Sequence, residues 1–357
     1  MKTIRYAVVG AGWITQEAFL PGIAQAANSE VSVLVSGSPE TARRLAGFHG
    51  IPHVTGYDGF DAMLAADLCD AVYVALPNSM HADYAIRAAR AGKHVMVEKP
   101  LAISVAEAEA MISAAAEAGV WLMTAYRLHC EPGTADLMAR IAAGEIGEPK
   151  LFSSIFSFLL PEGNHRLSAG HWGGPLQDVG VYCLNAARHV FGAEPVEAVA
   201  VKSHGTDPRF AEVEESIAVT LTFPEGRIAQ FLASFGADAV DSYTVVGTEG
   251  SLTLNPGFRF DLAQRLLAVK ADEFVTVDHP QVDHFAGQAA YFSDCILEGR
   301  RPGPDGEEGL ADMHALLAIE QAAKTGLPQR IGAPVLPFRR GTGMARRLPV
   351  TDRRLVL

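Results

Sequence analysis

The chain has 357 residues, of which 49% are hydrophobic and 20% charged, and its formal net charge is −12. A chain of this length is expected to form two domains, and it holds enough apolar residues for two cores without a metal or a disulfide. The acidic balance argues against a nucleic-acid partner, because a polyanion repels a protein of the same sign.

Two further patterns bear on the location of the protein. The apolar run from Tyr6 to Val9 is too short for a secretion signal, and no stretch approaches the ~20 apolar residues of a membrane span. The four cysteines form no C-x-x-C motif, which favours reduced thiols. We therefore expect a cytoplasmic protein with no membrane partner.

The first third of the chain alternates short β-branched runs with alanine-rich helical stretches, which predicts a parallel sheet with right-handed crossovers. In chain order, strands are predicted over 4–9, 31–35, 71–76, 95–97 and 120–125, and helices over 13–27, 39–48, 81–91 and 104–118.

The pattern changes after about residue 128, where strands follow one another without helices between them. Helices are predicted over 133–143, 178–191, 283–298 and 309–325, and strands over 196–203, 216–223, 227–234, 243–246 and 251–254. We therefore predict an α/β protein with a Rossmann parallel sheet in residues 1–128. A C-terminal α+β domain with a large, mostly antiparallel open sheet follows in 129–335, and then a basic arm in 336–357.

Gly10-Ala11-Gly12 follows a predicted strand and opens a helix, which is the context of a dinucleotide-binding loop. The first glycine makes the tight turn, and the second lets a pyrophosphate approach the backbone. The amides that open the helix at Trp13 and Ile14 then face the anion. Thr15 stands at the third position of the motif, where glycine or alanine is usual, so it must pack where the helix comes close to the sheet.

The end of the second strand selects the cofactor. No carboxylate stands there to bind the ribose hydroxyls of NAD. Instead Ser36 and Ser38 can donate to a 2′-phosphate, and Arg43 or Arg44 can neutralise it. The sequence favours NADP, with NAD as the open alternative and a solvated helix face as the other interpretation of the arginines.

A lysine directly follows the strand at 95–97, in Glu98-Lys99-Pro100. In open α/β sheets ligands bind at the carboxyl ends of the strands, so Lys99 is expected to project into the crevice. An ammonium group there can bond a substrate hydroxyl and lower the pKa of that hydroxyl.

At this point the sequence resembles the glucose–fructose oxidoreductase / inositol dehydrogenase / MocA family, and most closely its glucose–fructose oxidoreductase branch. The motifs that carry the resemblance, spread over roughly residues 4 to 335, are Gly10-Ala11-Gly12, Leu76-Pro77-Asn78 with His81, Glu98-Lys99-Pro100, and Gly173-Gly174 with Asp178, Gly180 and Tyr182. The resemblance implies an NADP-dependent enzyme acting on sugars or related cyclic hydroxyl compounds. It also implies Lys99, Asp178 and Tyr182 as the catalytic set, and cofactor contacts from the loops at 76–81 and 98–99.

The residues themselves support part of this assignment. Asp178 and Tyr182 are four apart on a predicted helix and so face the same way. Arg166 lies in the irregular segment before the glycine pair and is a candidate substrate ligand, with Lys99, Asp178 and Tyr182. Tyr126 and Arg127 end the last Rossmann strand and are further cofactor-site candidates. The histidines lack metal-ligand spacing, so no metal is expected.

These observations favour hydride transfer between a nicotinamide cofactor and a hydroxyl or carbonyl of a sugar, polyol or related cyclic compound. Tyr182 is expected to take the proton, with Lys99 as the alternative base. A non-catalytic NAD(P)-binding regulator and a reductase of a non-sugar carbonyl or dihydrodiol remain as alternatives. Because open antiparallel sheets commonly bury a face between subunits, a homodimer or homotetramer is expected.

Overall fold

The computed structural model describes residues 2–332 and 343–357, and the chain divides into two compact units. The first unit combines residues 1–130, 282–310 and 343–357, and the second combines 131–281 and 311–342. Each unit is thus assembled from separate stretches of the chain. The predicted arm at 336–357 lies partly outside the described residues, and its described end, 343–357, belongs to the first unit.

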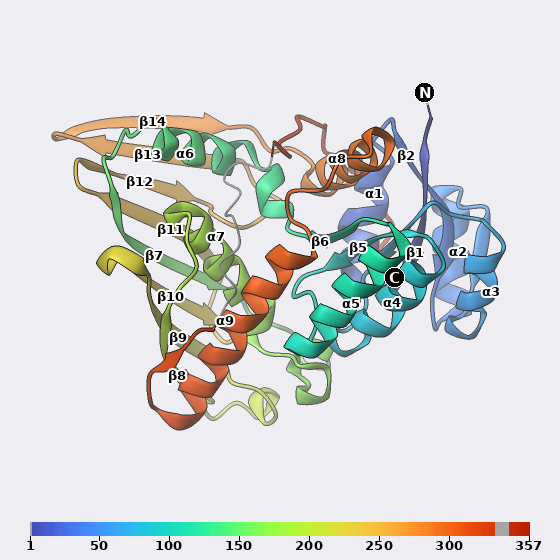
Figure 1. The fold of residues 1–357 in the computed structure, drawn as a ribbon, viewed down its shortest axis with the longest axis horizontal. Coiled ribbons are helices and arrows are strands. Elements are labelled where there is room, and N and C mark those ends of the chain that lie inside the picture. The colour runs from blue at the N-terminus through green and yellow to red at the C-terminus, as the bar shows by residue number, and fades with distance from the viewer. Residues whose placement is uncertain (1, 333–342) are drawn as a thin grey trace. The chain divides into compact units, whose positions relative to one another are not determined.

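The first unit is built on a six-stranded sheet whose order is β3-β2-β1-β4-β5-β6 (Figure 1). Every pair in it is parallel, as the strand–helix alternation predicts. The order reverses direction between β1 and β4, which is where a doubly wound sheet binds its ligand. The strands are β1 Ile4–Val9, β2 Ser29–Val35, β3 His53–Thr55, β4 Ala71–Val74, β5 His94–Glu98 and β6 Leu122–Ala125.

The crossover helices begin at recognisable caps. Ser38 and Ser104 accept the backbone N–H groups of Thr41 and Glu107 and so start α2 and α5. The first helix ends at Ile23, four residues before the predicted end, and its middle is a π-helical turn. The helices are η1 Thr15–Phe19, α1 Leu20–Ile23, α2 Pro39–His49, α3 Phe60–Ala65, α4 His81–Arg90, α5 Val105–Ala118 and α8 His284–Glu298, with short 3-10 turns η2 Tyr57–Gly59, η3 Asn78–Met80 and η4 Arg127–Cys130.

Helix α8 was expected to close the second domain, but it packs in the first unit. The hydroxyls of Tyr6 and Ser293 lie 2.9 Å apart, and the Asn28 amide donates to Asp294 at 2.7 Å. Arg346 of the C-terminal segment pairs with the same Asp294 at 3.2 Å. Buried polar contacts of this kind are invisible to helix periodicity, so the sequence could predict the helix but not its location.

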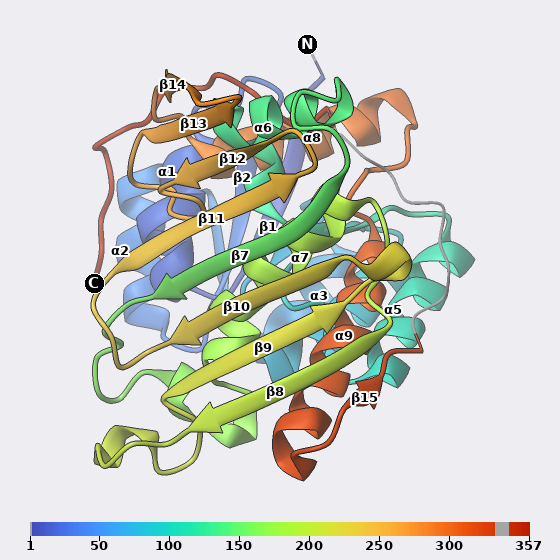
Figure 2. The same cartoon turned by 90° about the vertical axis from the view of Figure 1, so that its left-hand side faces the viewer.

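The second unit is built on a nine-stranded sheet that Figure 2 shows nearly face on. Its order is β14-β13-β12-β11-β7-β10-β9-β8-β15, and β10 with β7 is its one parallel pair among the described strands. The hairpins at Pro224-Glu225-Gly226 and Thr248-Glu249-Gly250 form as predicted. The strands are β7 Pro149–Ser157, β8 Glu197–Ser203, β9 Ser216–Thr222, β10 Ile228–Ser234, β11 Val240–Gly247, β12 Gly250–Asn255, β13 Gln264–Lys270, β14 Glu273–His279 and β15 Gln329–Arg330.

One face of this sheet is covered by helices, and side chains alternate along the strands accordingly. In β10, Phe231 points inward and is buried, whereas Leu232 points outward and is exposed. The remaining elements are α6 Pro132–Ala142, α7 Val181–Phe191 and α9 Gly306–Thr325, with the short turns η5 His165–Leu167, η6 Ala169–His171, η7 Leu176–Gly180, η8 Pro208–Phe210 and η9 Pro224–Gly226.

A buried charge network ties α7 to α9 inside the second unit. The Arg188 guanidinium donates to Asp312 at 2.7 Å and to Glu194 at 2.6 and 2.7 Å. The Asn185 amide donates to the other Asp312 oxygen at 3.0 Å. Arg188 and Asp312 are both 1% exposed, so their charges need the partners that this network supplies.

Replacing Asp312 with Ala removes a buried acceptor from the Arg188 guanidinium and from the Asn185 amide, while Glu194 stays bonded to Arg188. We expect the variant to lose about 1–3 kcal/mol of stability, because leaving buried donors without their acceptor costs free energy. Differential scanning calorimetry measures the loss as a lower transition temperature. Asp278→Ala, which removes a solvent-exposed pair with Arg265, is the matched control and should leave the transition in place. Equal transition temperatures for the two variants would contradict the assigned importance of the network.

Candidate active site

The glycine loop lies where β1 and β4 separate, and the structure shows why glycine stands at position 10. Gly10 has φ +104°, and a Cβ there would come within 2.2 Å of the carbonyl oxygen of Ala75. By contrast, a Cβ at Gly12 would meet no atom within 4 Å. The backbone is therefore closed on its sheet side and open at Gly12, which fits a pyrophosphate lying over the first amides of the helix.

Thr15 takes the place of the third glycine without loosening the loop. Its side chain is fully buried, and its hydroxyl donates to the Gly10 carbonyl at 2.7 Å. Gln16 donates from its amide to the Ala11 carbonyl at 2.6 Å. Two side chains of the first helical turn thus bond the loop that precedes them. Trp13, which is 51% exposed, lies at the solvent side of this turn.

The end of β2 places the predicted NADP residues at the start of α2. Ser36 is buried, and its hydroxyl accepts the backbone N–H of Ser38 at 3.2 Å. Ser38 caps α2, so the positive end of the helix dipole faces the same region. Arg43 and Arg44 are exposed on the first turns of α2. Both arginines are therefore accessible to solvent on the helix that follows β2.

His81 links two of the strand-end loops to one another. It is fully buried, and its two ring nitrogens each lie 2.9 Å from a backbone carbonyl oxygen, that of Leu76 and that of Pro100. Burial lowers the pKa of His81. The ring therefore supports the loop that carries Leu76, Pro77 and Asn78, and its expected contact with the cofactor stays a prediction.

Glu98 is held by a residue that sequence reasoning did not single out. The Tyr73 hydroxyl donates to a Glu98 oxygen at 2.6 Å, and the Tyr73 ring stacks on Phe19 with centroids 3.7 Å apart. Burial raises the pKa of Glu98, against the opposing effect of Lys99. Lys99 follows at the carboxyl end of β5, at the sheet edge that also carries Gly10.

Tyr126 and Arg127 follow β6, the next strand of the same sheet. Tyr126 is fully buried and Arg127 is 5% exposed. Within the first unit, one Arg127 nitrogen lies 3.4 Å from Nδ1 of His284 on α8. Burial and the Arg127 charge hold the pKa of His284 well below its usual value. Arg127 is thus part of the packing of α8.

In the second unit the structure brings Arg166 and Asp178 together. The Arg166 Nε lies 3.0 Å from an Asp178 oxygen, and both side chains are partly buried. The Gly174 N–H donates to the Arg166 carbonyl at 2.9 Å, and the Asp178 N–H donates to the Gly174 carbonyl at 3.2 Å. The sequence predicted each residue as a site element but gave no sign of the pair, because the two come from different turns.

Tyr182 lies near the start of α7, just after the π turn η7 that holds Asp178. The continuous helix therefore begins earlier than the predicted residue 178. The Tyr182 ring is 5% exposed and packs beside Phe156 and Phe258, with centroids 5.9 and 6.4 Å away. These aromatic contacts help to fix the ring.

A cavity of about 360 Å³ adjoins the Arg166 turn, and its volume is in the range of small-ligand sites. His165 and His171 line it, with ring centroids 6.5 Å apart, together with Glu212. Burial lowers the pKa of His165 to about 4, so this ring is neutral at pH 7. The cavity lining thus combines the neutral His165 ring with Arg209 and the acidic side chains of Glu162 and Glu212.

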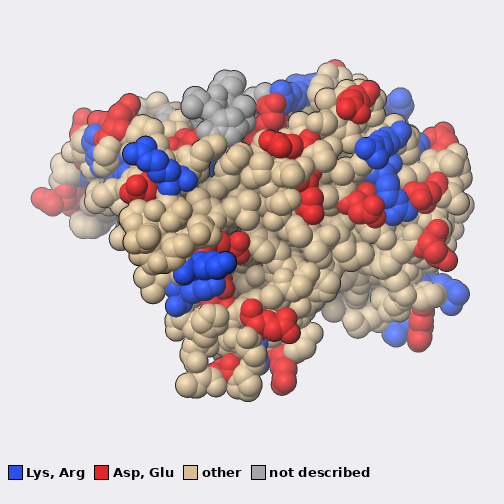
Figure 3. Space-filling view, turned by 60° about the horizontal axis from the view of Figure 1, so that its bottom comes forward, with Lys and Arg blue, Asp and Glu red and all other residues tan. Residues whose placement is uncertain are grey.

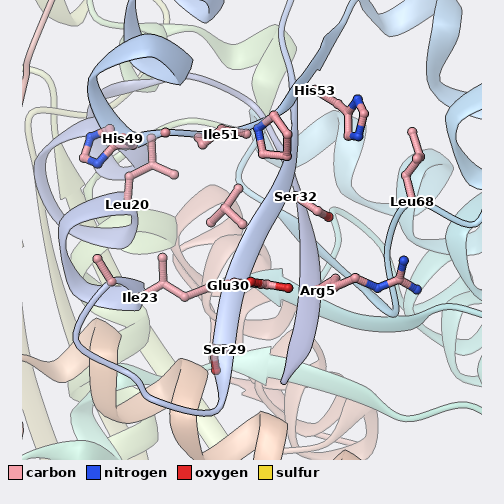
Figure 4. Close-up of a pocket in the computed structure, with 14 residues that line it drawn as sticks. Arg5, Leu20, Ile23, Ser29, Glu30, Ser32, His49, Ile51, His53 and Leu68 are labelled. Carbon is pink, nitrogen blue, oxygen red and sulfur yellow. The ribbon is translucent and has the colours of Figure 1, made fainter. Parts of the chain in front are cut away.

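A second pocket lies at the amino ends of strands of the parallel sheet (Figure 4). The glycine loop lies at their carboxyl ends. Arg5, Glu30 and His53 line it near the amino ends of their strands. The Arg5 guanidinium is already bonded to Asp70 at 2.8 and 3.0 Å. Since doubly wound sheets bind ligands at the carboxyl edge, this pocket is not part of the candidate site.

The surface and the side-chain clusters add two observations. On the face drawn in Figure 3, acidic and basic side chains lie next to one another. Within residues 2–332 and 343–357, no three His, Cys, Asp or Glu side chains gather as metal ligands would, and no helix has the length and apolarity needed to cross a bilayer.

Known proteins resemble the chain in both of its parts. Residues 4–126 match the family model of oxidoreductases with an NAD-binding Rossmann fold, and residues 134–253 match the GFO/IDH/MocA C-terminal domain. The D-xylose 1-dehydrogenase [NADP(+)] of Haloarcula marismortui is 32% identical over 331 residues, which cover 90% of this chain and 91% of that protein.

Solved structures agree with the sequence comparison. Aldose-aldose oxidoreductase from Caulobacter crescentus, complexed with glycerol, gives a TM-score of 0.88 at 35% identity over 92% of this chain and 100% of that chain. KijD10, a 3-ketoreductase from Actinomadura kijaniata bound to NADP and TDP-benzene, gives 0.83 at 30% identity over 90% and 98%. The chain therefore belongs to the GFO/IDH/MocA oxidoreductase family, with an NAD-binding Rossmann fold in its N-terminal part.

Proposed function

We propose that the protein is an NADP-dependent oxidoreductase that interconverts a hydroxyl and a carbonyl group of a sugar or a related polyol. One observation carries the proposal: the glycine loop and the Glu98-Lys99-Pro100 turn both lie at the carboxyl ends of strands in the same sheet. In doubly wound sheets the nucleotide binds at that edge, so Lys99 would lie near it. The names of the relatives support the substrate class, since they include a xylose dehydrogenase and an aldose-aldose oxidoreductase.

The residues present fit the dinucleotide. Gly10 and Gly12 leave room for the pyrophosphate over the amides of Trp13 and Ile14, and Thr15 holds that turn closed on the sheet. Ser36, Ser38 and Arg43 or Arg44 would bind the adenosine ribose and its 2′-phosphate. The loop at Leu76-Pro77-Asn78, braced by His81, and the turn at Glu98, with Tyr126 and Arg127 behind, would line the rest of the site.

A bound nicotinamide accepts or supplies the hydride, and the chain supplies the proton chemistry. In the oxidation direction, Tyr182 would act as its phenolate and take the proton of the substrate hydroxyl. The Lys99 ammonium stabilises the negative charge that grows on the substrate oxygen. Lys99 as the base is the alternative, and the pH profiles of Lys99 and Tyr182 variants distinguish the two.

Asp178 and Arg166 are proposed to orient the sugar. Their ion pair offers a carboxylate acceptor and guanidinium donors side by side, which is the set that vicinal hydroxyl groups require. The adjoining cavity at His165 and His171 gives space for the part of the sugar farther from the reacting carbon. Arginine and lysine side chains do not outnumber acidic ones in the lining of that cavity, which favours an uncharged sugar.

We further propose a homodimer or homotetramer formed through the uncovered face of the large sheet. Its central strands present outward-facing apolar side chains that are 38–49% exposed, and they are adjacent in register. A contiguous apolar patch of this kind marks an interface. The side chains are Leu151, Ile155, Ile228, Leu232 and Val246. The four cysteines are buried and form no disulfide, which supports the proposed cytoplasmic location.

The function is tested by following NADPH at 340 nm with aldoses, ketoses, inositols and dihydrodiols, using both NADP and NAD. We expect turnover of at least one sugar with NADP. Lys99→Ala should lower kcat by about 10²–10⁴, which is the usual contribution of a positioned proton-transfer or charge-stabilising group. Its Kd for NADPH should stay within a factor of three by fluorescence titration. Turnover by Lys99→Ala at the rate of the unaltered protein would disprove the lysine's role, and NADPH that fails to bind would disprove the function.

Cofactor selection is tested with the double variant Arg43→Ala/Arg44→Ala. Losing a charge-assisted bond to the 2′-phosphate costs about 1.5–3 kcal/mol, so KM for NADP should rise at least tenfold. KM for NAD should stay unchanged, because NAD lacks that phosphate. Arg90→Ala removes another exposed arginine of the same unit and serves as the control. Parallel changes in both KM values would show that these arginines do not read the phosphate.

The interface is tested with Leu232→Asp, which places a charge in the middle of the apolar face. Burying an unpaired carboxylate in an interface is costly, so sedimentation velocity should show a smaller species than the unaltered protein. Leu327→Asp changes an exposed leucine that lies outside that sheet and should leave the sedimentation coefficient unchanged. A monomeric unaltered protein would refute the proposed assembly.

A further inference from the structure

Glu320 on α9 contacts the turn that precedes η7 and α7. One of its carboxylate oxygens accepts two hydrogen bonds, from Nε1 of Trp172 at 2.9 Å and from Nε2 of Gln177 at 2.6 Å. Both donors belong to the segment that leads to Asp178, and Glu320 lies more than 140 residues farther along the chain. A single acceptor therefore holds both ends of that turn.

The held turn is conformationally unusual. Trp172 has φ +52°, in the left-handed region, which costs a non-glycine residue of order 1–3 kcal/mol. The two residues that follow are glycines, and a Cβ at Gly173 would come within 2.2 Å of the Arg166 carbonyl oxygen. Such a conformation persists only where surrounding contacts fix it, and the indole bond to Glu320 is a contact of that kind.

The geometry of the turn passes directly to the proposed substrate residues. Arg166 holds the turn through its carbonyl, which accepts the Gly174 N–H, and holds Asp178 through its guanidinium at 3.0 Å. Asp178 is the next residue after Gln177 and is bonded back to the Gly174 carbonyl. Hydrogen bonds thus connect Arg166, Gly174 and Asp178 to one another. Glu320 bonds to Trp172 and Gln177, on either side of the glycine pair.

We propose that Glu320 is a positioning residue for the substrate site: it fixes the turn 172–177 so that Asp178 and Arg166 hold the orientation that binds the sugar. The inference rests on the proposed function of Asp178 and Arg166, and it adds a residue that no sequence motif marks. Glu320 acts through Trp172 and Gln177 and not on the substrate itself.

We expect the acceptor oxygen of Glu320, rather than its charge, to hold the turn. Burial raises the pKa of Glu320, with the neighbouring Glu214 adding to that effect, while Lys202, Trp172 and Gln177 oppose it. The Lys202 ammonium nitrogen lies 3.8 Å from a carboxylate oxygen of Glu214. The two bonds need only one oxygen acceptor, which a glutamine side chain also supplies. The neutral isostere should therefore preserve the position of the turn.

The test compares Glu320→Leu with Glu320→Gln in steady-state kinetics with NADPH and the best sugar or keto-sugar substrate. We expect Glu320→Leu to raise KM for the sugar at least tenfold and to lower kcat by a smaller factor. Glu320→Gln should stay within threefold of the unaltered protein. Neither substitution should change the Kd for NADPH. Gln321→Leu, on the next and exposed position of α9, is the control for altering the helix surface.

Trp172 provides a readout that a general loss of stability would not reproduce. Trp172→Phe removes the indole donor and keeps the aromatic body, so it should raise KM in the same direction. In the double variant with Glu320→Leu, the two effects should be less than additive, because both substitutions remove the same bond between Trp172 and Glu320. The emission of Trp172, obtained as the difference between each protein and its Trp172→Phe counterpart, should shift in Glu320→Leu and not in Glu320→Gln.

The outcomes separate this inference from the proposed function. A folded Glu320→Leu with the unaltered sugar KM overturns the positioning role and leaves the function standing. Full additivity of Trp172→Phe and Glu320→Leu also overturns it. If the unaltered protein oxidises or reduces no sugar, the function itself fails, and the positioning role fails with it.

Discussion

The close approach of two backbones at Gly10 is the constraint on which the nucleotide site depends. β1 and β4 separate there, and the Ala75 carbonyl occupies the volume that any side chain at position 10 would need. The loop therefore turns at glycine, closes on the sheet and leaves its outer side open at Gly12. The helix that opens at Trp13 takes its direction from this turn, and Lys99 follows β5 at the same edge of the sheet.

Around that turn, side-chain hydrogen bonds hold the loops at the ends of the strands. Thr15 and Gln16 bond back to the loop, His81 lies between the Leu76 and Pro100 carbonyls, and Tyr73 fixes Glu98. None of these groups has to touch a ligand to matter. Each satisfies a polar atom that would be costly to bury alone, and each thereby fixes a loop whose own backbone would allow several conformations.

The second unit uses the same physical device with charges. Helix α9 supplies Asp312, which neutralises Arg188 inside α7, and Glu320, which binds the turn before α7. Helix α9, far along the chain, thus contacts both α7, which carries Tyr182, and the turn that leads into α7. Because buried carboxylates are costly unless they are paired or bonded, these contacts define one arrangement of α7 and disfavour the others.

The sequence by itself determined the local features: the alternation that gives a parallel sheet, the glycine loop, the Glu98-Lys99-Pro100 turn and the hairpins at 224–226 and 248–250. These depend on periodicity and on residues with special backbone preferences, which neighbouring positions reveal. Only the tertiary structure decided that α8 packs with the first unit, that Arg166 pairs with Asp178, and that Glu320 holds Trp172. These contacts join residues 12 to more than 280 positions apart, and their partners are chosen by how helices and sheets pack, which no local pattern encodes.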